Sequence, residues 1–143
     1  MLRILKLASI AILTACANPS HPDDPGGLAS GVQVEAGQQF DIAAGQAVQV
    51  RGAGIGIHFS GVSDDSRCPS DVQCVWAGNA IVRLDLTSSG AASAEARLNT
   101  TLDPKSINYA GYRIALVGLK PVPRSGTTIP AASYVATLEV RPL

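Results

Sequence analysis

The sequence is poor in aromatic, charged and histidine residues. Phe, Trp and Tyr make up 4% of the 143 residues, Asp, Glu, Lys and Arg make up 15%, and histidine occurs twice. Eleven basic residues against eleven acidic ones leave no positive excess that would attract nucleic acid. No second long apolar run follows the first fifteen residues, and no segment keeps the i, i+3, i+4, i+7 stripe of a helix. These absences argue against nucleic-acid binding and against a helical fold.

The common enzyme motifs are also missing. The sequence has no GxSxG nucleophile elbow and no cluster with the spacing of a compact zinc site, and His58 is the only histidine after residue 30. A hydrolase would need a nucleophile beside that histidine, and no motif supplies one. We therefore expect a protein that is not an enzyme and that uses no cofactor, with a hydrolase as the least favoured alternative.

The first fifteen residues have the form of an export signal. Arg3 and Lys6 precede the apolar run LASIAIL, which is too short to span a bilayer as a mature helix. The run leads into LTAC, which resembles the bacterial lipoprotein box and implies cleavage before Cys16 and lipidation of that cysteine. Ala17 rather than Asp after the cysteine favours the outer membrane, on its periplasmic or surface side, in a bacterium with two membranes. The alternative is an ordinary secretory signal in which the cysteine is incidental.

Residues 16–30 are expected to tether a folded domain to this membrane anchor. The segment is rich in Pro, Gly, Asp and Ser, and a histidine within it, His21, is expected to be solvated. Loss of Arg3 and Lys6 with the signal would leave 11 − 2 = 9 basic residues against 11 acidic ones. Residues 31–143 have the length of one domain.

From residue 31 onward, apolar residues recur at every second position, as in strands that bury one face. Turn-forming clusters such as SSGAAS (88–93) and PRSGTTIP (123–130) separate the runs. The pattern predicts an all-β domain, a single antiparallel β-sandwich of about seven strands, immunoglobulin-like by analogy only. The alternating apolar residues are Val48 and Val50; Ile55, Ile57 and Phe59; Ala80, Val82, Leu84 and Leu86; Ala94, Ala96 and Leu98; Tyr112, Ile114 and Leu116; and Tyr134, Ala136, Leu138 and Val140.

The stretch DSRCPSDVQCVWAG, Asp65 to Gly78, concentrates the residues with distinctive chemistry. Lipidation of Cys16 would leave Cys68 and Cys74 as the remaining pair, which favours one disulfide in an exported domain. A metal site that combines these two thiolates with His58 or a nearby aspartate, Asp64 or Asp65, remains an alternative, although the spacing matches no compact zinc pattern. A redox dithiol is less favoured, because the pair is not a CxxC at a helix start.

Trp76 and Arg67 in the same stretch each allow two interpretations. The indole of Trp76, the only tryptophan, either packs over the disulfide and caps one end of the sandwich or forms an exposed binding anchor. Arg67 either contacts a partner or pairs with Asp64, Asp65 or Asp71 and orders the loop.

Four segments mark out most of the domain, over about residues 40–140: HFSGVSDDSRCP, VQCVWAGNAIVRL, YRIALVGLKPVP and YVATLEV. Together they resemble a family of small exported bacterial proteins, many of them with lipoprotein signals. The resemblance implies an exported β domain and assigns no activity or catalytic residue. Anchor, tether and rigid domain together are typical of display at a surface. We therefore expect an envelope accessory or binding domain with an envelope protein or glycan as its partner, with a metal-binding lipoprotein as the alternative.

Overall fold

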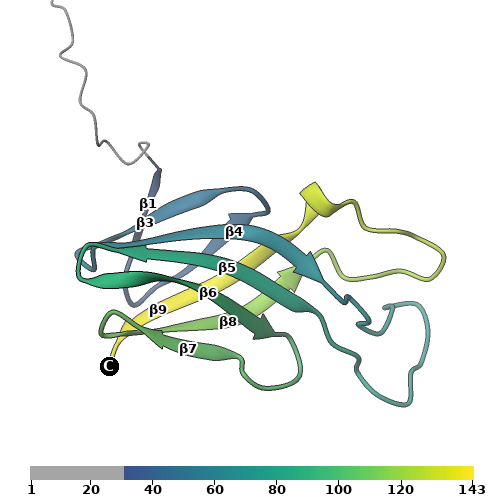
Figure 1. Ribbon diagram of the computed structural model, residues 1–143. Coiled ribbons are helices and arrows are strands. Elements are labelled where there is room, and N and C mark those ends of the chain that lie inside the picture. Colours follow the sequence, from purple (N-terminus) through teal and green to yellow (C-terminus); the bar gives the residue numbers. More distant parts are fainter. Residues whose placement is uncertain (1–30) are drawn as a thin grey trace, which may run out of the picture.

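Residues 31–143, the part of the chain that the computed structural model describes, form nine β-strands in two sheets (Figure 1). One sheet has the order β1-β3-β4-β5-β6 and the other has the order β2-β9-β8-β7. The strands are β1 (Val32–Glu35), β2 (Gln39–Ala43), β3 (Ala47–Arg51), β4 (Ile55–Ser63), β5 (Ile81–Ser88), β6 (Ala91–Asn99), β7 (Ser106–Tyr109), β8 (Tyr112–Lys120) and β9 (Val135–Pro142), with the 3₁₀ turn η1 (Ala131–Ser133) before β9. The predicted signal, Cys16 and His21 lie outside the described residues.

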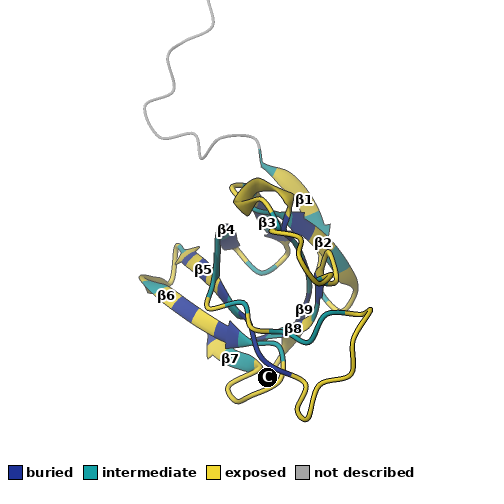
Figure 2. Ribbon diagram, turned by 90° about the vertical axis from the view of Figure 1, so that its right-hand side faces the viewer, coloured by how far each residue is buried: buried dark blue, intermediate teal, exposed yellow. Residues whose placement is uncertain are grey.

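The strands form because alternate side chains can be buried between the two sheets. Along β5, Val82, Leu84 and Leu86 are fully buried while the residues between them are exposed. The same alternation appears in β6, β8 and β9, and Figure 2 shows buried and exposed residues alternating along β6. The largest fully buried side chains are Phe59, Ile42, Ile55, Ile57, Leu84, Leu86, Leu98, Ile114, Leu138, Val48, Val82 and Val140.

The predicted all-β sandwich is confirmed, with nine strands where about seven were expected. Every strand pair is antiparallel except β1–β3, which is parallel. The strands that the sequence did not indicate, β1, β2 and β7, have only four or five residues. Among residues 31–143, no helix has the length and apolar character needed to cross a membrane.

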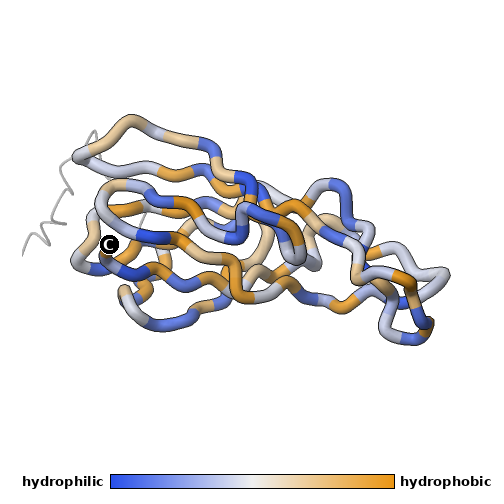
Figure 3. The backbone as a smooth tube through the Cα atoms, turned by 90° about the horizontal axis from the view of Figure 1, so that it is seen from below, coloured by the Kyte–Doolittle hydropathy of each residue, from blue (hydrophilic) through white to orange (hydrophobic). Residues whose placement is uncertain are grey.

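The antiparallel arrangement brings three long connections to one end of the sandwich. The β4–β5, β6–β7 and β8–β9 connections lie at the right in Figure 1, opposite the C-terminus. Figure 3 shows stretches of apolar residues, in orange, within these projecting connections. We call this the loop end, and it carries most of the residues that the sequence singled out.

Candidate functional site

The β4–β5 connection, residues 64–80, is called the Cys loop here, and it continues the β4–β5 pairing beyond the sheet. The Ser66 N–H donates to the carbonyl of Asn79 at 2.7 Å, and the Asn79 N–H donates to the Ser66 hydroxyl at 3.2 Å. Gly78 has φ +70°, and a Cβ atom there would lie 1.9 Å from the Ser66 carbonyl oxygen. Only glycine therefore lets the two arms of the loop approach this closely.

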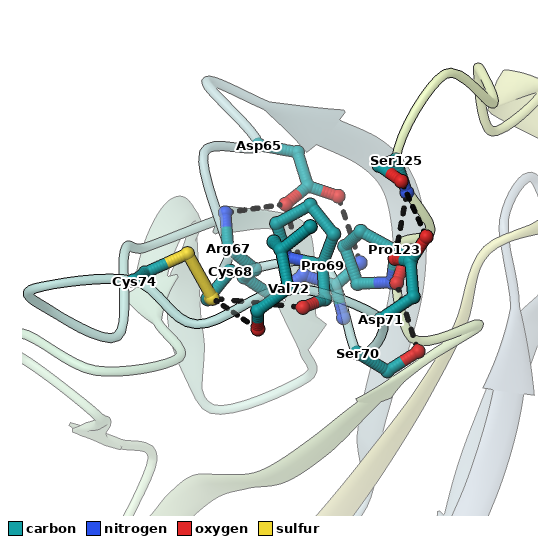
Figure 4. Close-up of a disulfide and its surroundings, with 10 residues drawn as sticks. All are labelled: Asp65, Arg67, Cys68, Pro69, Ser70, Asp71, Val72, Cys74, Pro123 and Ser125. Carbon is teal, nitrogen blue, oxygen red and sulfur yellow. Dashed lines mark hydrogen bonds and ion pairs between the residues drawn. A yellow bond between two sulfur atoms is a disulfide. The ribbon is translucent and has the colours of Figure 1, made fainter.

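The predicted disulfide closes the outer part of the Cys loop (Figure 4). Cys68 and Cys74 are bonded with an S–S length of 2.08 Å and a Cα–Cα distance of 6.0 Å, which confirms the predicted pairing. The Cys68 N–H donates to the carbonyl of Ala77 at 2.9 Å. The bridge and this bond fix the path of the chain on both sides of Val75 and Trp76.

Arg67 is a bracing residue of the Cys loop, since its guanidinium is nearly buried, with 11% of the side chain exposed. Nε and Nη2 donate to the two carboxylate oxygens of Asp65 at 2.8 and 2.7 Å. Nη1 donates to the carbonyl of Leu119 at 2.7 Å, and Nη2 also donates to that of Pro121 at 3.0 Å. The prediction that Arg67 pairs with a loop aspartate is thus confirmed for Asp65, and the guanidinium is not a free contact group.

A phenol hydroxyl completes this cluster. The Tyr134 hydroxyl, just before β9, donates to Asp65 Oδ2 at 2.9 Å, and the Arg67 guanidinium lies 6.0 Å from the ring centre. Burial raises the pKa of Asp65, but hydrogen bonds from Arg67 and Tyr134 outweigh it and hold the pKa below its usual 3.8. Burial and the bond to Asp65 raise the pKa of the Tyr134 hydroxyl. Asp65 is therefore a charged carboxylate, stabilised in place, and Tyr134 is neutral.

A second set of bonds joins the Cys loop to residues 121–130, called the proline loop here. The Ser70 N–H and hydroxyl donate to the carbonyl of Pro123 at 2.9 and 3.3 Å. The Ser125 N–H donates to Asp71 Oδ1 at 2.9 Å, and its hydroxyl donates to the other carboxylate oxygen (Figure 4). The hydrogen bonds from Ser125 lower the pKa of Asp71. The two loops therefore form one structural unit.

Trp76 is not the buried cap of the sandwich. The residue is 55% exposed, so the interpretation in which the indole is buried as a cap of the sandwich is wrong. Val75 beside it is fully exposed, and the unit formed by the two loops also exposes Val72 at 46% and Val122 at 60%. We call Val72, Val75, Trp76 and Val122 the exposed apolar set. Apolar side chains held in water by a braced loop are typical of a contact surface.

The proline loop also forms a groove of about 290 Å³. Val122, Ile129 and Pro130 supply apolar walls, and Arg124 is its one charged lining residue within the described part of the chain. The groove gives the loop end a recess beside the exposed apolar set.

Asn79 is a structural residue that the sequence pattern did not reveal. It is buried, and its side-chain amide donates to Asn99 Oδ1 at 2.8 Å. The side-chain oxygen Oδ1 of Asn79 accepts from the N–H groups of Thr101 and Leu102 at 3.1 and 3.4 Å. Asn79 thus ties the β6–β7 connection to the base of the Cys loop, a tertiary contact without a local sequence signal.

The residues considered for metal binding or hydrolysis do not form a site. The disulfide occupies both thiols, and residues 31–143 contain no group of three or more His, Cys, Asp or Glu arranged to hold a metal. His58 lies on the outer face of β4, with Nδ1 3.0 Å from Asp85 Oδ2 and 43% of its side chain exposed. Within residues 31–143 Asp85 is the only hydrogen-bond partner of the His58 imidazole, so no nucleophile is paired with the ring there. Asp64, the first residue of the Cys loop, is exposed.

Comparison of the chain with protein-family models, curated protein sequences and solved structures finds no match.

Proposed function

We propose that the protein is a membrane-anchored bacterial lipoprotein whose β-sandwich is a non-enzymatic accessory domain that binds an envelope component through its loop end. The observation that carries the proposal is the exposure of Trp76 on a loop whose conformation is already fixed. A preorganised anchor loses little conformational entropy when a partner binds. The lipidation of Cys16 and the location at the outer membrane are part of this proposal.

The composition of the contact surface favours a protein over a glycan. Three of the four residues in the exposed apolar set are valines, which offer apolar area but no groups for sugar hydroxyls. Tryptophan is among the residues most often found at the energetic centre of protein interfaces. A glycan partner remains a distinguishable result of the experiment below.

The test is site-specific crosslinking in the envelope, with a photoreactive amino acid in place of Val75. We expect one adduct of defined mass, lost when the same chain carries Trp76→Ala. A photoreactive group at Val32, which is 54% exposed on β1, and the variant Val117→Ala, 47% exposed on β8, are matched controls. Protease digestion converts a protein adduct to a peptide adduct and leaves a glycan adduct intact. Absence of any adduct at position 75, or adducts that persist in Trp76→Ala, would contradict the proposal.

The membrane anchor has a separate test. Wild type is expected to incorporate labelled palmitate and to sediment with membranes, whereas Cys16→Ser is expected to do neither. Palmitate labelling of the Cys16→Ser variant would contradict the assignment of the anchor. The result does not depend on the loop-end partner, so the two parts of the proposal fail independently.

A further inference from the structure

The edge strand β6 has main-chain groups without a hydrogen-bond partner among residues 31–143. β6 pairs with β5 on one side only, and it ends the five-stranded sheet. The Thr100 N–H points toward β5 and donates to the Ala80 carbonyl, whereas the Asn99 N–H points away and donates to the Pro104 carbonyl. Main-chain groups alternate in direction along a strand, and the register from Leu86 to Ile81 is regular. The N–H and C=O groups of Glu95 and Arg97 therefore point away from the sheet.

The charges on this edge are complementary to their own copy in one register. Glu95 and Arg97 lie on the outer face of β6, with 44% and 67% of their side chains exposed. In an antiparallel pair of two β6 strands with Ala96 on the two-fold axis, Glu95 lies opposite Arg97 of the second copy, and Arg97 lies opposite its Glu95. Both residues have outward-pointing main-chain groups, so each such pair is hydrogen-bonded in both directions. Oppositely charged pairs directly across an antiparallel ladder are stabilising.

The shape of the strand fits the same register. Its first part consists of the small residues Ala91, Ala92 and Ser93, which are exposed. In this register they lie opposite residues 99–101 of the second copy, where its β6–β7 connection begins. The Ala92 carbonyl already accepts from the Tyr109 hydroxyl at 2.9 Å, and the Asn99 N–H already donates to the Pro104 carbonyl at 2.9 Å. The ladder between the copies is therefore confined to the residues around Ala96. Ala94 and Ala96 face the core side, so no bulky group lies at the two-fold axis.

We propose that a second copy of this chain binds along β6, forming a two-fold dimer with a ten-stranded continuous sheet (five strands from each copy). The interface is isologous, because each copy contributes the same strand. Charged residues on an edge strand often prevent such pairing. Here the register that places Glu95 of one copy opposite Arg97 of the other also places their outward-pointing main-chain groups opposite each other, so the same pairs form the hydrogen bonds between the strands. The inference is independent of the loop-end partner.

Sedimentation velocity of the purified protein over a range of concentrations tests the dimer. We expect a reversible monomer–dimer equilibrium whose dissociation constant rises about tenfold in Glu95→Arg and in Arg97→Glu, because each change places like charges opposite one another twice. The exchanged variant, Glu95→Arg with Arg97→Glu, restores the opposite pairing and is expected to return the constant to within about threefold of wild type. Glu35→Arg, a reversal on the other edge of the sheet, is the control and is expected to change nothing.

Each remaining outcome overturns the proposal. If wild type is monomeric at every concentration, Glu95 and Arg97 prevent pairing along β6. If the dissociation constant is unchanged in the single-reversal variants, or stays high in the exchanged variant, the dimer uses another surface or another register. Within its own chain Glu95 contacts Arg83 at 3.5 Å and Arg97 at 3.1 Å, so each reversal also removes an intrachain ion pair. Thermal unfolding of each variant identifies a loss of folding, and Arg97→Glu leaves the Arg83 contact in place.

Discussion

At the residue scale, the Cys loop depends on one glycine. Gly78 combines a left-handed backbone with a position where a Cβ atom would collide with the Ser66 carbonyl. Gly126 in the proline loop has nearly the same φ, +68°, but open space around it. The pair therefore separates steric collision from backbone strain.

We expect Gly78→Ala to lower the free energy of unfolding by about 3 kcal/mol or more, since strain and collision add. Gly126→Ala is expected to cost only about 1 kcal/mol, the strain alone. Urea denaturation of both variants measures the difference. Equal losses in the two variants would show that the collision is relieved by movement of the Ser66 arm.

The carboxylate of Asp65 makes a pH-dependent contribution to stability. Its pKa is lower in the folded protein than in the unfolded chain, so the stabilisation is complete above the unfolded value of about 4 and is lost as the pH falls through the folded value. In Asp65→Asn, Arg67 remains nearly buried without a counter-charge, and we expect a loss of about 3 kcal/mol at neutral pH.

This loss is expected to shrink as the pH is lowered from about 5 toward 2, because wild type then also loses the charge. Asp41 and Asp71, whose pKa values are also lowered, are present in both proteins, so their contributions cancel in the difference. Urea denaturation at several pH values checks this. If the difference in free energy of unfolding between wild type and Asp65→Asn were the same at every pH, the charge of Asp65 would not be the source of the loss. Arg67→Lys keeps the charge but loses the fork of donors, so it too is expected to lower the free energy of unfolding relative to wild type.

The sequence predicted some of these residues and not others, for a physical reason. Cys68 and Cys74 follow from residue count and export, and the Asp65–Arg67 pair lies within three residues. The carbonyls of Leu119 and Pro121 that hold Arg67 lie 52 and 54 residues away, and any residue type supplies a carbonyl. The direction of the Trp76 side chain likewise depends on this tertiary anchoring, so the local sequence did not reveal it.

At the element scale, strands were predictable where alternation lasts long enough. β4, β5, β6, β8 and β9 have eight or nine residues, and most of their buried positions belong to the predicted apolar sets. Leu119, beyond the register shift in β8, is buried but was not predicted, and Tyr112 and Ala94 are only partly buried. β1, β2 and β7 have four or five residues, and no residue of β1 is buried. An alternation this short revealed β3, through Val48 and Val50, but it is too weak a signal to identify the other short strands, so pairing with neighbouring strands decides these elements.

The Cys loop is an element with two independent supports, the disulfide and the bonds to the proline loop. The chain-entropy model gives at most about 2.4 kcal/mol for a bridge that closes about seven residues. We expect Cys68→Ala with Cys74→Ala to lose less than this, because Arg67, Ser70 and Asp71 still hold the loop against its neighbours. Urea denaturation measures the loss, and wild type in reductant is expected to match the variant. Complete unfolding on reduction would show that the bridge supports the sandwich itself.

At the scale of the whole molecule, the loop end and the β6 edge are separate surfaces. The exposed apolar set lies beyond the strands, whereas Glu95 lies within β6, opposite Asp85. Antiparallel pairing of two β6 strands would direct the two loop ends in opposite directions along the joined sheet. Each copy would then present its own loop end to a separate partner.

This separation predicts that the two interactions respond to different substitutions. Trp76→Ala is expected to abolish the envelope adduct and to leave the dimer dissociation constant unchanged, whereas Glu95→Arg is expected to weaken the dimer and leave the adduct in place. The double variant should show both effects at their single-variant sizes, because distant sites without shared contacts act additively. Crosslinking and sedimentation of the four proteins measure this. If Trp76→Ala also dissociates the dimer, the loop end is itself the surface where two copies meet, because only then would one side chain serve both interactions.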